Sequence, residues 1–206
     1  MAHPSLDTLP LTRRTPTSWA TRALERPLDL LVDHAHLERK AASNALALLG
    51  RWPDTLDPER WSFVLAGIAR DEAEHLALVL RLLHRRGGRF AKFHDNPYAK
   101  ALRAQVRTGG GPDELVDRLC VSALIELRSC ERFALLGDAA AEEDLVRLYR
   151  ALWASEHGHY ASFVELAGAV AGESAAHARW TQWLAIEGEA IAAQPAGPRL
   201  HAGWES

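Results

Sequence analysis

Cysteine is scarce in this chain. Two cysteines, Cys120 and Cys130, occur among 206 residues, and no CxxC pair is present. Disulfide-held secreted domains carry many closely spaced cysteines, and structural zinc or rubredoxin-type iron sites need paired ones. The composition therefore excludes a disulfide scaffold and a cysteine-based metal site, and it is typical of reduced thiols in the cytoplasm.

Long apolar runs are also absent. The amino-terminal stretch MAHPSLDTLPLTRRTPTSWA has no continuous hydrophobic segment of the kind that secretory signals carry. No later segment reaches the roughly 18 uninterrupted apolar residues that a membrane span needs. We therefore expect a soluble, intracellular, cytoplasmic protein without a membrane partner.

Segments that alternate β-branched and polar residues are missing as well, so no sheet is indicated. Alanine, leucine, arginine and glutamate dominate instead, and these residues favour helices. Glycine- and proline-bearing stretches divide the chain into segments of helical periodicity. We predict four long helices and a fifth, shorter one, over residues 27–49, 58–86, 113–136, 141–171 and 173–193.

These helices predict one domain over residues 1–206, because the length supports one sizeable core and leaves little room for a second. Long helices with short connectors favour an antiparallel bundle, here over about 27–171. One connector, 87–112, is long and lies between the second and third helices, as in ferritin-like crossovers. The expected fold is therefore an all-α, ferritin-like four-helix bundle with an extra C-terminal helix and a flexible tail from about residue 195.

Charged residues interrupt the apolar stripe of each core helix near its middle. On the second helix, positions three and four apart read Trp61, Leu65, Ile68, Glu72, His75, Val79 and Leu82, and such positions share one face. The first and third helices each carry a lone glutamate, and the second and fourth each carry Glu-x-x-His. The six interrupting residues are Glu38, Glu72, His75, Glu126, Glu156 and His159.

Four carboxylates and two imidazoles at one level of a core would repel one another and lose hydration, at a cost of several kcal/mol per ion. Two divalent metal ions would remove that cost. Glu-x-x-His places both side chains on one side of a helix, where they reach a single ion. The pattern matches the known ligand plan of di-iron and di-manganese carboxylate bundles. The alternative is that these residues form buried ion pairs without a metal. One Glu-x-x-His motif distinguishes the two poorly, but two copies, each preceded by a glutamate in the apolar stripe of the preceding helix, favour a dinuclear metal site.

The residues around the lone glutamates are small, whereas bulkier apolar residues surround the Glu-x-x-His motifs. The small ones are Ala35, Ala42, Ser122 and Ser129. We hypothesise that a substrate cavity opens between the first and third helices. The alternative is that small residues only allow close helix packing.

Several stretches resemble the bacterial tRNA hydroxylases of the MiaE type, which act on 2-methylthio-N6-isopentenyladenosine beside the anticodon. They are LVDHAHLERKAA (31–42), ARDEAEHLALV (69–79), NPYAKALRAQVR (96–107), SALIELRSCERFALL (122–136) and ASEHGHYASFVELA (154–167). The resemblance implies a di-iron monooxygenase that inserts one oxygen atom from dioxygen into the isopentenyl side chain of tRNA. It also implies that Glu72 and Glu156 bridge the ions, that Glu38 with His75 completes one, and that Glu126 with His159 completes the other.

Other functions use the same six residues. A ferritin-like oxidase or peroxidase, or a dimanganese catalase, would act on small oxygen species, and a third possibility is a non-catalytic storage or structural bundle. Iron and manganese accept this ligand set similarly, so manganese stays an alternative to iron. The lack of a cysteine module counts against a rubrerythrin-type peroxidase and means that electrons come from an external donor.

Residues 76–112 carry eight lysines or arginines against one acid, Asp95, in a chain of net charge −3. Such a patch suits phosphates, and the aromatic residues Phe90, Phe93 and Tyr98 in the same segment suit an unpaired base. The alternative is a solvated helix end and loop. Together with the resemblance, this favours tRNA, and not DNA, as the partner, with contacts at Arg85, Arg86, Arg89, Lys92, Lys100, Arg103 and Arg107.

Further expectations concern single residues near the six. We expect His34, one turn before Glu38, to be a surface or locally bonded residue; the alternative is that it orients the Glu38 carboxylate. His36 and Lys40 are expected to face solvent, although Lys40 could meet a phosphate. Glu131 falls on a different face from Glu126 and is left out of the ligand set.

Overall fold

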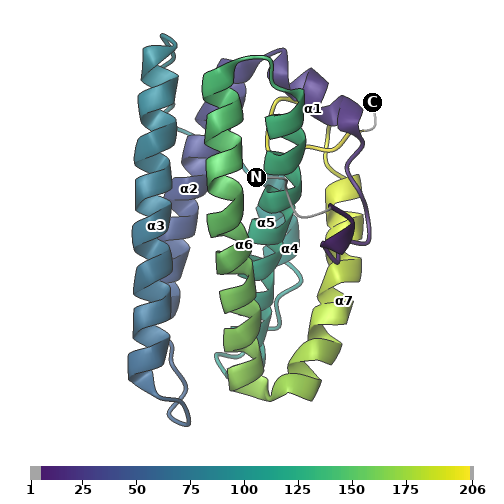
Figure 1. Ribbon diagram of the computed structural model, residues 1–206. Helices are drawn as coiled ribbons and strands as arrows, with labels where there is room; N and C mark the ends of the chain where they lie inside the picture. The colour runs from purple at the N-terminus through teal and green to yellow at the C-terminus, as the bar shows by residue number, and fades with distance from the viewer. Residues whose placement is uncertain (1–5, 205–206) are drawn as a thin grey trace.

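Four long helices form the bundle in the computed structural model, which describes residues 6–204. They are α2 (Pro27–Leu49), α3 (Pro58–Arg85), α5 (Pro112–Ala139) and α6 (Glu143–Ala171). α2 packs along α3 and α5 along α6, so the bundle consists of two antiparallel hairpins (Figure 1). The predicted all-α, ferritin-like bundle is confirmed, and the predicted helix ends differ from the observed ones by up to three residues.

Local chemistry explains where the helices begin. Proline occupies the first position of α2, α3 and α5, where its missing N–H costs nothing. The Asp57 carboxylate caps α3 by accepting a hydrogen bond from the Glu59 N–H at 2.9 Å. Gly172, at φ 81°, ends α6 and turns the chain into α7 (Glu173–Ala192).

Three short elements were not predicted. They are the 3₁₀-helix η1 (Leu6–Thr8), α1 (Thr17–Leu24) and α4 (Pro97–Arg103). α4 lies within the long connector between α3 and α5 and packs on α5 and α7 (Figure 1). The crossover is therefore partly helical, and it covers one side of the bundle.

The carboxyl-terminal part of the chain packs against the bundle. α7 lies along α6 and α5, with Trp180 and Trp183 buried beneath it. The expected flexible tail from residue 195 is wrong, because Leu200 and Ala202 are buried. The Leu200 N–H donates to the Asp33 carboxylate on α2 at 2.9 Å, which ties the tail to the first core helix.

α5 is the most enclosed helix, since α1, α4, α6 and α7 all pack against it. The buried apolar side chains of the described residues form one continuous cluster that runs through the bundle. Within residues 6–204, no helix is both long and apolar enough to cross a membrane. The six charged residues of the stripes therefore lie inside a single core.

Candidate metal centre

The six predicted residues meet at one level of the bundle. They form two groups, Glu38, Glu72, His75 and Glu156 in one, and Glu72, Glu126, Glu156 and His159 in the other. Within each group, one potential ligand atom per residue lies within 4.8 Å of the others. Glu72 and Glu156 belong to both groups, which is the arrangement that two neighbouring ions with shared carboxylates require.

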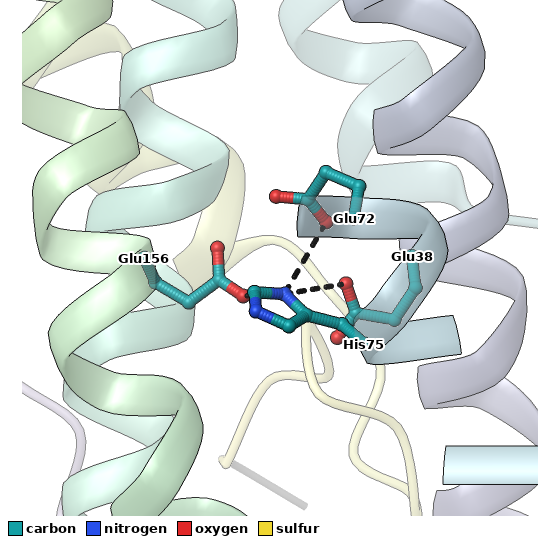
Figure 2. Close-up of side chains that lie close together, drawn as sticks. All are labelled: Glu38, Glu72, His75 and Glu156. Carbon is teal, nitrogen blue, oxygen red and sulfur yellow. Dashed lines mark ion pairs between the residues drawn. The ribbon is translucent and has the colours of Figure 1, made fainter. Parts of the chain in front are cut away.

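Each histidine of the centre reaches a carboxylate of the opposite hairpin. His75 Nδ1 on α3 lies 3.0 Å from Glu156 Oε1 on α6, and 3.9 Å from Glu38 Oε2 and Glu72 Oε2 (Figure 2). His159 Nδ1 on α6 lies 2.7 Å from Glu72 Oε1 on α3. The centre therefore connects the two hairpins of the bundle.

The oxygens and nitrogens that could bind a metal are close together, but they do not form hydrogen bonds with one another. Both oxygens of Glu72 and of Glu156, and Nδ1 of His75 and of His159, are buried without a hydrogen-bond partner. Leaving such a group unsatisfied costs about 1–3 kcal/mol, and more when it is charged. Cations placed among these atoms would satisfy them, and mixed carboxylate and imidazole donors suit iron or manganese. The residues therefore fit a metal site.

The pKa values of the buried carboxylates shift in opposite directions. Burial, and then repulsion from Glu72, raises the pKa of Glu38 and of Glu126 well above its usual value. Burial also opposes the charge of Glu156, but His159 and His75 outweigh it and lower the pKa of Glu156 to about 2. Without a cation, protons must therefore neutralise part of this cluster.

The two histidines of the centre are more basic than usual. Burial disfavours the charged ring of His75, but Glu156 and Glu72 outweigh it and raise the pKa of His75 to about 9. The same balance raises the pKa of His159 to about 10. A metal ion must displace these protons, so metal uptake is expected to release them.

His34 is not at the surface, but it is locally bonded, which was the other part of the expectation. Its side chain is fully buried, and its Nε2 shares a hydrogen bond with Glu38 Oε1 one turn along α2, in which Nε2–H is the donor when Glu38 is ionised. Burial, the main cause, lowers the pKa of His34 to about 3, so the ring is neutral. The alternative role, in which His34 orients the Glu38 carboxylate, therefore fits the structure.

His36 is also buried, which corrects its predicted exposure. Its ring stacks on Phe90 and His94, with centroids 4.3 Å and 4.7 Å away. Both partners belong to the segment between α3 and α4, which folds back over α2. Residue spacing within α2 carries no sign of this contact.

A cavity of about 190 Å³ opens between α2 and α5 and reaches Glu126. Leu37, Ala41 and Asn44 line it from α2, and Ser122 and Ile125 line it from α5. The predicted cavity between the first and third core helices is thereby confirmed. Its remaining side was not predicted, because α4 and the residues before it close the cavity there.

Three cations stand around this cavity: Lys40, Lys100 and Arg103. Lys40 Nζ lies 2.8 Å from His94 Nδ1, which holds the amine at the cavity instead of in open solvent. Lys100 forms an ion pair with Asp95, and Arg103 has no ion pair within residues 6–204. We call these three residues the cationic rim.

Three of the seven predicted RNA-contacting residues form ion pairs within the protein: Lys100 through its exposed pair with Asp95, and Arg86 and Arg107 through contacts that are partly buried. Arg86 pairs with Asp144 and Glu142 at the start of α6. Arg107 pairs with Asp113 and with the buried Asp117. The charges of Arg86 and Arg107 are therefore already balanced within the protein, so the positive patch of residues 76–112 is smaller than the count of its lysines and arginines suggests. No ion pair is found for Arg85, Arg89 or Lys92 in the described part of the chain.

Fold and site together define the class: a ferritin-like bundle with a buried carboxylate and histidine metal site. Residues 5–202 match the family described as tRNA-(MS[2]IO[6]A)-hydroxylase (MiaE), and the chain belongs to this family.

Two curated relatives are named tRNA 2-(methylsulfanyl)-N(6)-isopentenyladenosine(37) hydroxylase. The Pseudomonas putida protein is 40% identical over 190 residues, which cover 92% of this chain and 90% of the relative. The Salmonella typhimurium protein is 29% identical over 238 residues, which cover 92% of this chain and 86% of the relative. A similar solved structure is protein 43 with aldehyde deformylating oxygenase activity from Synechococcus, with a TM-score of 0.86 and 32% identity over 94% of this chain and 96% of that one.

Proposed function

We propose that this protein is a di-iron monooxygenase that hydroxylates the isopentenyl side chain of 2-methylthio-N6-isopentenyladenosine beside the anticodon of tRNA. It uses dioxygen and electrons from an external donor, and it works in the cytoplasm, where tRNA is found. The family and its named relatives support the substrate. The observation that carries the chemistry is the pair of ligand groups that share two glutamates beside a cavity.

The ligands in this proposal are Glu38, Glu72, His75, Glu126, Glu156 and His159. Iron is proposed over manganese because the similar solved structure is an oxygenase. Bound iron supplies the activation of dioxygen, which side chains alone do not perform. The bundle contributes a buried, water-poor site, since these four carboxylates and His159 are almost fully covered.

The cavity suits an alkyl group attached to a nucleobase. Leu37, Ala41 and Ile125 give it apolar surface, and Glu126 forms part of its wall. An isopentenyl group placed between α2 and α5 would point its carbons toward the Glu126 side of the centre. Positioning of this kind lowers the barrier by fixing which carbon meets the oxidant.

The cationic rim suits the phosphates on either side of that nucleotide. Lys40, Lys100 and Arg103 surround the same cavity, so they can bind the backbone while the base is inside. Arg85, Arg89 and Lys92 would extend the contact along the crossover. Arg86 and Arg107 are proposed to hold the crossover in place through their ion pairs, and not to bind RNA directly.

Nucleoside analysis of tRNA tests the activity. Cells that make the methylthiolated isopentenyladenosine but lack its hydroxylase are complemented with this chain or with Glu126→Gln. We expect the hydroxylated nucleoside with the wild-type chain only. The proposal would be refuted if cells that contain the iron-loaded wild-type protein still made tRNA without the hydroxylated nucleoside. Rapid decomposition of hydrogen peroxide by that protein would instead favour the catalase alternative.

The rim is tested with the same tRNA. Replacing Lys40 and Arg103 by Gln should weaken binding and lower the salt dependence by about 0.7–0.9 in log–log slope per lost phosphate contact. Arg147→Gln on α6 is the matched control, because this exposed arginine lies outside the rim. An unchanged slope in the double variant would remove the rim from the RNA interface.

A further inference from the structure

The two ligand groups differ in what holds their outer carboxylate. Glu38 accepts a hydrogen bond from the buried His34, a residue outside the six. No side chain outside the six donates a hydrogen bond to Glu126 within residues 6–204, and Glu126 lines the cavity. One carboxylate is therefore held by a side chain outside the six, and the other, in the described part of the chain, is not.

The His34 ring is itself held in place. It packs against Phe133 and Tyr149, with ring centroids 5.0 Å and 5.9 Å away, and it is stacked on Tyr149 at 14°. The ring is fully buried, and its Nδ1 has no hydrogen-bond partner. Only the tautomer with its proton on Nε2 can donate to the Glu38 carboxylate.

This contact decides which oxygen Glu38 can offer. Oε1 is occupied by His34, and Oε2 faces His75 Nδ1 at 3.9 Å (Figure 2). The hydrogen bond thus leaves one oxygen of Glu38 directed at the centre. At the other group, Asp71 Oδ2 lies 3.4 Å from His159 Nε2, so that contact concerns the ring of His159 and not the Glu126 carboxylate.

We propose that His34 is a positioning residue that fixes Glu38 as a one-oxygen ligand, whereas Glu126 keeps the freedom to change its coordination beside the cavity. The inference rests on the metal centre of the proposed function. Outer-shell partners of this kind typically change metal affinity by about 10–100-fold when removed. The effect of His34 should therefore be confined to the ion held by Glu38 and His75.

Cobalt(II) titration of the metal-free chain, without tRNA or dioxygen, tests this assignment. Glu126→Gln is used to weaken metal binding in the group that contains Glu126, and Glu38→Gln to weaken it in the other group. Binding of the remaining cobalt ion is followed by its visible absorption. Adding His34→Leu to Glu126→Gln should lower the affinity for the remaining cobalt ion by about 10–100-fold. Adding it to Glu38→Gln should change the remaining affinity by less than about twofold, because the two positions are then independent.

Two matched variants separate positioning from general damage. His34→Gln keeps an N–H donor in a side chain of similar reach, so it should recover most of the affinity lost in His34→Leu, and it serves if the leucine variant does not fold. His36→Gln changes a histidine on the same helix that is equally buried but does not touch Glu38, and it should bind cobalt like the wild type.

Each result has one meaning. Equal losses in both glutamine backgrounds, or none in either, would overturn the positioning role. Failure of the wild-type chain to bind two cobalt ions would instead refute the metal centre, and with it the proposed function. Cobalt binding as predicted without any tRNA product would refute the hydroxylase proposal while leaving the role of His34 intact.

Discussion

Two buried acidic regions lie on opposite faces of α5, and they neutralise charge in different ways. Glu126 faces the metal centre, where four carboxylates are opposed only by imidazoles. Glu131, five residues later, faces the segment before α1: it pairs with Arg128, and the Thr15 N–H donates to it at 3.1 Å. Arg128 also binds Glu187 of α7 through two contacts, at 2.7 Å and 2.8 Å.

The difference shows that the partner of a buried acid, and not its burial alone, indicates its role. The Arg128 guanidinium, Thr15 and the Tyr98 hydroxyl donate to the oxygens of Glu131 and Glu187, so these two carboxylates are paired without a cation. The metal centre leaves oxygens of Glu72 and Glu156 without donors, so it is complete only with a cation. A buried charge without its partner destabilises a fold strongly. The two regions therefore make opposite predictions for similar substitutions.

The largest effect on stability is expected at Glu187. Glu187→Gln removes the charge that faces Arg128 in a site where both side chains are fully buried, so the free energy of unfolding should fall by about 3–5 kcal/mol. Urea denaturation of the metal-free chain measures it. Glu189→Gln on the same helix is the control, because its pair with Arg13 is exposed and should be worth less than about 1 kcal/mol. Equal losses in both variants would break the comparison.

Asp117 should show the same behaviour with a smaller effect and a defined pH dependence. Its buried carboxylate accepts hydrogen bonds from Arg179 at 2.7 Å, Arg107 at 2.9 Å and the Trp183 indole at 3.0 Å. Burial opposes its charge, but Arg179 and Arg107 outweigh burial and hold the pKa far below its usual value of 3.8. Asp117→Asn should lower stability at neutral pH by about 1–3 kcal/mol.

The sign of the pH dependence follows from the lowered pKa. The stabilisation by Asp117 is complete above the unfolded pKa of 3.8 and is lost as the pH falls from there toward the folded pKa. Melting temperatures of wild type and Asp117→Asn should therefore differ by a constant amount between about pH 5 and 7 and converge below about pH 4. A gap that stays constant down to pH 3 would show that the carboxylate charge is not what stabilises this site.

The sequence predicted those parts of the fold that show helical periodicity, namely the four long helices and the polar residues in their apolar stripes. Long amphipathic helices have stripes that repeat many times, so α2, α3, α5 and α6 and their six interrupting residues could be aligned from that repeat. α1 and α4 have eight and seven residues, which is too short for a periodic signal. Their positions depend on packing against α5, which residue spacing alone does not show.

Contacts between distant segments explain the remaining errors. His36 is buried because Phe90 and His94 fold back over it, and Arg86 is neutralised by an acid 58 residues away, Asp144. Glu126 and Glu131 both occur in the stretch LIELRSCERF, yet their surroundings differ. Thr15, in the segment before α1, donates to Glu131, whereas Glu126 faces the cavity. Local sequence therefore identified the six residues that cluster in the core but not what surrounds them.

The smallest effect on stability is expected at Glu126, a residue of the metal centre. Burial and repulsion from Glu72 raise the pKa of Glu126 well above its usual value, which favours the protonated carboxyl group in the metal-free protein, and glutamine closely resembles that form. Glu126→Gln should therefore change the free energy of unfolding of the metal-free chain by no more than about 0.5 kcal/mol. The same variant should lose affinity for the second metal ion, because a neutral amide is a poor ligand. Urea denaturation beside Glu187→Gln checks this contrast: a loss at Glu126 as large as that at Glu187 would mean that Glu126 carries a structural charge pair, and that the two faces of α5 do not differ in kind.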